Sequence, residues 1–406
     1  MRRDSMSAPV QMPLLPSPFL RDPARPEVFV VPGADAYAAA REALRAVGLS
    51  PARGRRVLLK PNAGRLTAAG SGVTTSPQVV AAAIDAFVAA GATVAVGESP
   101  ITGVRTPEAF EATGIAAVAR ERGCPLLDMD ARRGRRVAVP EGRAIRTLTV
   151  CPELFDFDLV VSIPVMKTHM HTGVSLAVKN MKGCLWRRTK VDLHMLPPVA
   201  GETARSLDVA IADMSGVLRP HLALMDGSIG LEGLGPSAGR PRPLGAIVAG
   251  ADAFAADAVA CRLMGLDAGE VAHLRIGAGR GYGTIDLARI AVAPADWMSL
   301  AQSFARPPTS LAFEFPGVVV HDSQSCSACQ STLLLFLRQH ADELREYVPA
   351  GDPVHVAIGK GHTTLPAGTL RIGNCARCPD SGGLHIPGCP PVSSAILREL
   401  KKRKPA

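Results

Sequence analysis

Five of the nine cysteines in this 406-residue chain lie after residue 325, and their spacing suggests metal chemistry. They are Cys326, Cys329, Cys375, Cys378 and Cys389. Two Cys-x2-Cys pairs place thiolates on tight turns, where both sulfurs can reach one metal ion or cluster. The 45 residues between the pairs exceed the roughly 15–20 of a compact zinc ribbon, although a folded insert can bridge a longer gap. The spacing predicts a metal site and leaves the metal open.

The fifth cysteine, Cys389, lies in the run Gly388-Cys389-Pro390-Pro391, ahead of an expected helix over residues 392–400. This run resembles the Gly-Cys-Pro-Pro element of the small iron–sulfur subunit of NADH:quinone oxidoreductase, whose cysteine ligates a four-iron cluster. Physically, a helix N-terminus offers positive potential to an anionic cluster. We therefore expect one [4Fe-4S] cluster, with zinc as an alternative and free or redox-active thiols as another. Five thiols exceed the four that a cubane needs, and the sequence does not select among them.

A second group of reactive side chains follows an apolar run over residues 159–163, which we expect to be a buried strand. Ligand sites of α/β proteins lie at such carboxyl ends of strands. Lys167 and Lys179 are suited to hold a carboxylate or phosphate, and His169 to move protons near neutral pH. His169 and His171 are two residues apart, so in an extended segment both face one side and can bind a metal. Alternatively, these side chains only satisfy the backbone of a loop.

The candidate site has two sets of residues. The expected catalytic residues are His169, Lys167 and Lys179. The expected substrate-binding residues are Lys60, Asn62, Thr75, His171, Asn180 and Lys182.

A βαβ unit is expected to position part of this site. The short apolar runs over residues 57–60 and 93–96 predict two buried strands. Between them, Thr74-Thr75-Ser76-Pro77 predicts a helix start, because a hydroxyl N-cap is followed by proline at the first helical position. We expect an α/β fold, a mostly parallel sheet with flanking helices, plus a small C-terminal cysteine-rich α/β module. The expected divisions are an irregular arm over 1–26, an α/β core over 27–295 and an iron–sulfur module over 296–406.

Five short motifs occur together along the core. They are Val57-Leu58-Leu59-Lys60-Pro61-Asn62, Thr74-Thr75-Ser76-Pro77, Gly97-Glu98-Ser99-Pro100, Lys167-Thr168-His169 and Lys179-Asn180-x2-Gly183. In combination they resemble domain-of-unknown-function family 362. The resemblance implies an α/β fold and frequent association with iron–sulfur clusters, but no settled reaction. Many relatives carry four closely spaced cysteines in one run; this chain lacks that run, which favours one cluster over a two-cluster electron wire.

Composition limits the classes of partner. The net charge of +9 is scattered and aromatic residues make up only 4% of the chain, so we expect no nucleic-acid partner. Neither a signal peptide nor an apolar run of about 18 residues is visible, which predicts a cytoplasmic protein without a membrane partner. The glycine-rich loops over 227–235 and 277–283 do not fit a dinucleotide fingerprint, so NAD and ATP are not expected.

Three functions follow from these patterns. The first is an iron–sulfur oxidoreductase acting on a small anionic substrate in a cleft lined by Lys and His, with an electron-donor protein as a partner. The second is a non-redox [4Fe-4S] lyase whose open iron acts as a Lewis acid. The third is an electron-transfer or redox-sensing protein without its own substrate. A carrier does not need the polar residues around Lys167, so the oxidoreductase is preferred.

Overall fold

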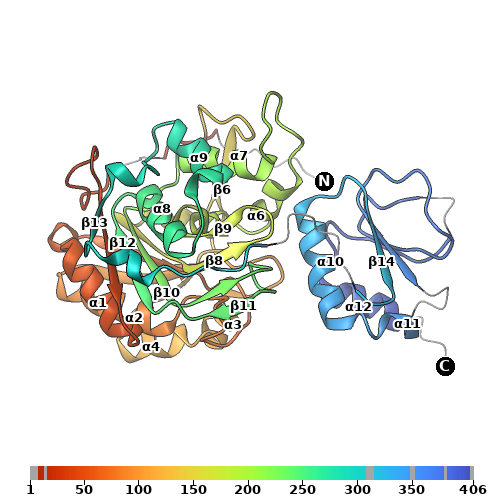
Figure 1. Cartoon of the computed structure of the whole chain (residues 1–406), viewed down its shortest axis with the longest axis horizontal. Helices are drawn as coiled ribbons and strands as arrows, with labels where there is room; N and C mark the ends of the chain where they lie inside the picture. Colours follow the sequence, from red (N-terminus) through yellow and green to blue (C-terminus); the bar gives the residue numbers. More distant parts are fainter. Residues whose placement is uncertain (1–7, 13–15, 308–314, 348–352, 379–381, 403–406) are drawn as a thin grey trace. The chain divides into compact units, whose positions relative to one another are not determined.

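A computed structural model describes residues 8–12, 16–307, 315–347, 353–378 and 382–402 of the chain. The chain divides into two compact units, Met1–Pro307 and Pro308–Ala406 (Figure 1). Residues 296–307 thus group with the first unit. Of the expected arm over 1–26, residues 1–7 and 13–15 lie outside the described residues. No helix in the described part of the chain is long and apolar enough to cross a membrane.

The first unit is built on a large mixed sheet. Its described residues form an 11-stranded sheet with the central order β13-β1-β12-β10-β7-β2-β3-β4. The strands of this sheet are β1 (Glu27–Pro32), β2 (Arg56–Pro61), β3 (Thr93–Glu98), β4 (Leu126–Asp128), β7 (Leu159–Ile163), β8 (Val165–His169), β9 (Gly173–Ser175), β10 (Leu222–Glu232), β11 (Arg240–Arg242), β12 (Ala246–Gly250) and β13 (Ala291–Ala293). A separate antiparallel pair is formed by β5 (Arg135–Ala138) and β6 (Thr147–Val150).

The centre of the sheet is parallel. Strands β10, β7, β2, β3 and β4 pair in parallel, whereas β12 pairs antiparallel with both β10 and β1. The register sets Lys60 opposite Ser162 and Pro61 opposite Ile163, so β2 and β7 end at the same edge. The mostly parallel α/β fold expected from the sequence is confirmed.

Helices cover both faces of this sheet (Figure 1). One hydrophobic core contains Val57, Leu59 and Val161, and the other contains Leu58 and Val160. Both faces of each strand are therefore buried, which explains why the strands read as continuous apolar runs rather than alternating ones. The helices with residues in the first of these cores are α1 (Ala36–Val47), α2 (Pro77–Ala89), α3 (Thr106–Ala112) and α4 (Ile115–Glu121). Those with residues in the second are α5 (Ala177–Asn180), α7 (Ser206–Ser215), α8 (Ala253–Leu263) and α9 (Ala272–Gly279).

The helix start expected after β2 is present. The side chain of Ser76 accepts a hydrogen bond from the backbone N–H of Gln78, and Pro77 is the first residue of α2. The hydroxyl cap fixes where α2 begins, and so holds Thr75 immediately beside the end of β2.

The second unit has a small core of its own. Four parallel strands, β14 (Val318–Asp322), β15 (Val354–Ile358), β16 (Leu370–Ile372) and β17 (His385–Ile386), form a sheet in sequence order. The helices are α10 (Ser327–His340), α11 (Leu344–Tyr347) and α12 (Ser393–Lys401). Phe336 of α10 and Ile396 of α12 pack with Val356 and Ile372 in one core. Helix α10 begins at Ser327, and Cys326 is its N-cap.

Candidate functional site

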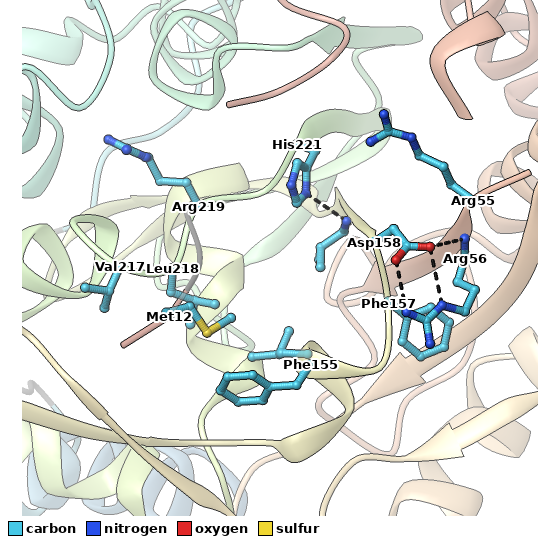
Figure 2. Close-up of a pocket in the computed structure, with 12 residues that line it drawn as sticks. Met12, Arg55, Arg56, Phe155, Phe157, Asp158, Val217, Leu218, Arg219 and His221 are labelled. Atoms are coloured by element: carbon cyan, nitrogen blue, oxygen red, sulfur yellow. Dashed lines mark hydrogen bonds and ion pairs between the residues drawn. The ribbon is translucent and has the colours of Figure 1, made fainter. Parts of the chain in front are cut away.

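A cavity of about 470 Å³ lies at the amino ends of β2, β7 and β10 (Figure 2). Several of the polar groups that line it form hydrogen bonds or ion pairs with one another. Asp158 accepts from the backbone N–H of Arg56 at 2.8 Å and pairs with the Arg56 guanidinium at 3.0 Å. His221 Nδ1 accepts from the N–H of Val160 at 3.0 Å. The residues expected to bind substrate do not line this cavity; they gather at the opposite, carboxyl edge of the sheet.

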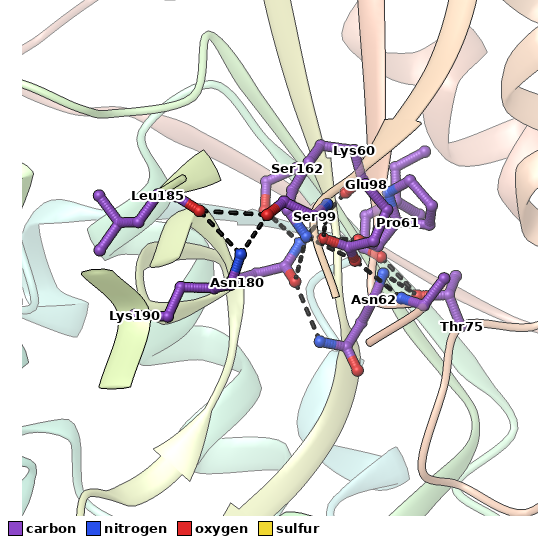
Figure 3. Close-up of polar contacts among 12 residues, drawn as sticks. Lys60, Pro61, Asn62, Thr75, Glu98, Ser99, Ser162, Asn180, Leu185 and Lys190 are labelled. Carbon is purple, nitrogen blue, oxygen red and sulfur yellow. Dashed lines mark hydrogen bonds and ion pairs between the residues drawn. The ribbon is translucent and has the colours of Figure 1, made fainter. Parts of the chain in front are cut away.

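At the carboxyl edge, β2 and β3 present a buried ion pair (Figure 3). The Lys60 ammonium lies 2.9 Å from Glu98 Oε2, and both side chains are almost fully buried, at 1% and 2% exposure. Lys60 also donates to the carbonyl of Pro61 at 2.7 Å and to Asn180 Oδ1 at 3.2 Å. A buried charge needs such complete pairing, because desolvation of an unpaired ion costs several kcal/mol.

Asn180 joins β2 and β7 at this edge (Figure 3). Its Nδ2 donates to the carbonyl of Lys60 and to Ser162 Oγ, both at 3.1 Å, and its Oδ1 accepts from Asn62 Nδ2 at 3.2 Å. The hydroxyl of Thr75 accepts from the backbone N–H of Asn62 at 2.8 Å. The structure thus brings four expected substrate-binding residues together: Lys60, Asn62, Thr75 and Asn180.

Gly183 explains the spacing of the Lys-Asn-x2-Gly motif. A Cβ at this position would lie 2.5 Å from Lys60 Nζ and 2.6 Å from Glu98 Oε1. Real Cβ atoms do not approach other atoms so closely, so only glycine lets the backbone after Asn180 pack onto the buried ion pair.

Lys167 on β8 is a buried lysine whose hydrogen-bond partners in the described part of the chain are neutral acceptors. Its ammonium donates to Asn62 Oδ1 at 2.9 Å and to the carbonyl of Val73 at 2.8 Å. Burial lowers the pKa of Lys167 to about 7, and the positive charges of Arg65 and Lys60 lower it further in the same direction. Near neutral pH the amine is therefore divided between its charged and neutral forms.

Two further lysines, Lys179 and Lys182, follow on α5 and the turn after it. Lys179 donates to Ser175 Oγ at 3.2 Å, and its pKa is held well below its ordinary value by burial and by the charges of Lys182 and Lys167. Lys182 contacts His194 Nε2, and burial followed by the charge of Lys190 lowers the pKa of Lys182 to about 7. Among the described residues, no carboxylate lies within ion-pair distance of Lys167, Lys179 or Lys182.

Histidines form a row beside these lysines. The ring centroids of His169 and His171 are 5.8 Å apart, and those of His171 and His194 are 6.5 Å apart. His169 Nδ1 accepts from the backbone N–H of His171 at 3.1 Å, which leaves the ring proton on Nε2 in the neutral form. Burial and the charge of Lys179 lower the pKa of His169 well below its ordinary value. Within the described ranges, no group of three or more His, Cys, Asp or Glu is close enough to hold a metal ion.

Asp257 of α8 holds α5 in place from outside the site. Its two carboxylate oxygens accept from the backbone N–H groups of Ala177 and Val178, at 2.7 and 3.1 Å. These are first-turn donors of α5 that have no partner within the helix. Asp257 therefore fixes the short helix that carries Lys179 and Asn180.

Glu98 and Lys190 are site residues that sequence reasoning did not assign. Lys190 contacts Ser99 Oγ, donates to the carbonyl of Leu185 at 2.9 Å and lies 3.7 Å from Asp130. The distribution of lysine along the sequence could have indicated Lys190. The first 307 residues contain only five lysines, and all other basic residues there are arginine or histidine. The five are Lys60, Lys167, Lys179, Lys182 and Lys190, and every one lies at this edge.

The second unit gathers four of the five C-terminal cysteines. Cys326 caps α10, and Cys329 follows in its first turn. A hydrogen bond from Cys329, followed by backbone N–H groups of α10, lowers the pKa of Cys326 to about 6. The pKa of the Cys329 thiol is raised by that bond, by burial and by the nearby charges of Cys326, Cys389 and Cys375. Cys378 instead donates to the carbonyl of Thr363 at 3.6 Å.

Comparison with known proteins adds three findings. The family described as Domain of unknown function (DUF362) matches residues 57–262. Thylakoid-associated protein sll1697 of Synechocystis sp. (strain ATCC 27184 / PCC 6803 / Kazusa) is 32% identical over 214 residues, which are 53% of this chain and 64% of that protein. The match thus spans less than two thirds of the relative's length. The lactate racemase apoprotein from Thermoanaerobacterium thermosaccharolyticum aligns with a TM-score of 0.39 and 13% identity, over 63% of this chain and 59% of that one.

Proposed function

The chain belongs to the DUF362 family, whose description names no reaction, and from its own site we propose that it is an iron–sulfur oxidoreductase acting on a small anionic substrate. One observation carries the proposal. Three lysines with depressed pKa values, Lys167, Lys179 and Lys182, lie together at the carboxyl edge of the sheet without a carboxylate among the described residues.

Such a cluster is unfavourable in the absence of an anion. Burial and mutual repulsion both disfavour the charged ammonium groups. A carboxylate or phosphate bound among them would remove the repulsion and accept charge-assisted hydrogen bonds. Lys167 and Lys179 come from different elements, β8 and α5, so they can hold an anion from two directions.

His169 is the proposed proton-transfer group. Its lowered pKa keeps the ring neutral near pH 7, and the N–H of His171 fixes the tautomer with the proton on Nε2. A neutral imidazole beside lysines that are only partly protonated is suited to exchange protons with a bound anion.

The cysteines of the second unit fit an iron–sulfur cluster. The donor set is thiol sulfur, and the lowered pKa of Cys326 supplies a thiolate near neutral pH. Among the described residues, no three potential ligands lie close enough together to bind one metal ion. A cubane needs less close sulfurs, because its four ligands bind four different iron atoms rather than one zinc ion. When bound, a [4Fe-4S] cluster would supply single electrons. As part of the same proposal the protein works in the cytoplasm, where thiols stay reduced, with an electron-donor protein as its partner.

Anion binding tests the proposal directly. Orthophosphate, sulfate and succinate are titrated calorimetrically into the full-length protein and into Lys167→Met and Lys179→Met. Each substitution removes a charge-assisted hydrogen bond worth about 1.5–3 kcal/mol, so the Kd of the tightest probe should rise roughly 10- to 150-fold.

Arg53→Met is the matched control. Arg53 is an exposed residue at the amino end of β2, and its replacement removes the same charge at the opposite edge of the sheet. Its Kd should equal that of the wild type. Failure of all three probes to bind the wild type, or equal Kd values for the wild type and both lysine variants, would overturn the anion site.

A further inference from the structure

The start of α10 brings two thiols together. Cys326 is the N-cap of the helix and Cys329 lies in its first turn, and their side chains are hydrogen-bonded to each other. The first-turn N–H groups of a helix stabilise negative charge on nearby thiolates. Two ligands of an anionic cluster can therefore come from this helix start.

Two loops that follow β16 and β17 run side by side next to these thiols. The N–H of Asn374 donates to the carbonyl of Gly388 at 2.7 Å, and Asn374 Oδ1 accepts from the N–H of Gly388 at 2.8 Å. The N–H of Gly373 donates to the carbonyl of Ile386 at 2.9 Å. Cys375 and Cys389 each follow directly after these paired residues, so the pairing holds the two cysteines close to each other.

The surroundings of Gly373 show that these loops lie next to the start of α10. Its φ is +101°, and a Cβ built on it would lie 3.6 Å from Cys329 Sγ and 3.8 Å from the carbonyl oxygen of Gly388. The sulfur of Cys329 therefore lies against the two paired loops.

Cys378 differs from the other four. Its side chain is buried, at 2% exposure, and its Sγ donates to the carbonyl of Thr363 at 3.6 Å. Its own carbonyl accepts from the Arg371 guanidinium at 2.6 Å, which fixes the backbone at this position. Burial and the contact with Thr363 fit a thiol that packs in the interior of this unit.

We propose that Cys326, Cys329, Cys375 and Cys389 are the four ligands of the cluster and that Cys378 is a structural thiol. Asn374 is a positioning residue that aligns the loops of Cys375 and Cys389. The assignment rests on the proposed function, because it presupposes that the second unit holds a cluster.

The test uses the full-length chain purified without oxygen. Iron and acid-labile sulfide per chain are measured for the wild type and for five single Cys→Ala variants, together with the EPR spectrum after dithionite reduction. Cys378→Ala should keep wild-type iron, sulfide and EPR signal. Each of the other four should fall below about half of the wild-type iron content and lose the wild-type signal, because a missing ligand destabilises bound metal.

The outcomes separate the assignment from the proposed function. A wild type without iron and sulfide contradicts the cluster itself. A wild type with a full cluster, together with loss of iron in Cys378→Ala and its retention in Cys375→Ala, overturns only the assignment. Cys378→Ser, which keeps a donor for Thr363, distinguishes loss of a ligand from disturbed packing: retained iron in this variant supports a structural role.

A second measurement does not depend on how the variants fold. Cys375 is exposed, so its thiol is accessible to N-ethylmaleimide unless it is bound. In the wild-type holoprotein, mass spectrometry should find Cys375 unmodified, and removal of iron by a chelator should make it reactive. Equal labelling before and after iron removal, with the cluster intact at the start, would remove Cys375 from the ligand set.

Discussion

Lys167 has an ammonium group whose charge depends on what is bound beside it. With its pKa lowered to about 7 by burial and neighbouring cations, the side chain loses its proton as the pH rises through neutrality. A bound anion favours the charged form and raises this pKa. Above pH 7, anion binding must therefore take up a proton at Lys167, and the same holds for Lys182, whose pKa is also lowered to about 7.

The affinity for sulfate should consequently fall as the pH rises from 6.5 to 8.5. Sulfate keeps a constant charge over this range, so the change reports on the protein. The expected loss is up to about tenfold per pH unit for each proton taken up. Calorimetry in two buffers of different ionisation enthalpy measures the proton uptake itself. An affinity that is equal at pH 6.5 and 8.5, with no proton uptake, would show that these lysines do not contact the anion.

The Lys60–Glu98 pair has a different role from the unpaired lysines. Because both side chains are almost fully buried, removal of one partner leaves an uncompensated charge. Glu98→Gln keeps the size of the side chain but removes the charge. It also removes one of the two oxygens that accept from the N–H groups of Ala63 and Ser99. It should lower the free energy of unfolding by about 3–5 kcal/mol, measured by urea denaturation.

The double variant Lys60→Met/Glu98→Gln is the control for this prediction. It removes both charges and should recover part of the stability lost in Glu98→Gln. A single variant as stable as the wild type would mean that the pair is not desolvated as the structure describes.

At the scale of elements, α5 depends on α8. This four-residue helix is too short to be stable alone, and Asp257 supplies acceptors for two of its N–H groups. Asp257→Asn replaces one acceptor oxygen by a donor that faces an N–H group. We expect a loss of about 1–3 kcal/mol in stability and weaker sulfate binding, since Lys179 lies on the loosened helix.

Asp252→Asn is the matched control on the same helix. Asp252 is the N-cap of α8, and Asn is about as good an N-cap as Asp. Asn keeps the acceptor for the cap but loses the oxygen that accepts from the N–H of Thr284 at 3.1 Å, so this variant should also lose some stability. Its sulfate affinity should match that of the wild type. Equal sulfate affinities in Asp257→Asn and Asp252→Asn would show that α5 does not contribute to the anion site.

The elements also show how much of the candidate site could be predicted from the sequence. Lys60, Asn62 and Thr75 were predictable as neighbours, because they lie at the end of one strand and the start of the helix that follows it. That α/β pattern, with parallel strands buried on both faces, is local and repeated, so it is visible in the sequence. Whether these residues bind substrate remains a prediction.

Contacts between distant segments were not predictable in the same way. Nothing local to Glu98 indicates that it neutralises Lys60, because the pairing depends on the register between β2 and β3. Asp257 reaches α5 across 80 residues of sequence, and the approach of Gly373 to Cys329 depends on how the second unit folds. Without that fold, the five C-terminal cysteines are equivalent candidate ligands, and Cys378 cannot be distinguished from the other four.

At the scale of the whole molecule, the chain joins two units with separate cores. The first contains the lysine-rich edge and the second contains the gathered cysteines. A redox enzyme needs both, one to hold the anion and one to supply electrons. A pure electron carrier needs only the second, and a site with three depressed lysine pKa values in the first would then have no use.

Stoichiometric reduction of the full-length protein tests the redox function most directly. The chain is purified without oxygen, analysed for iron, zinc and acid-labile sulfide, and titrated with dithionite while its EPR spectrum is recorded. We predict about four irons and four sulfides per chain and an EPR signal that develops with about one electron per chain. One zinc per chain without sulfide, or a full cluster that accepts no electron, would contradict an iron–sulfur oxidoreductase.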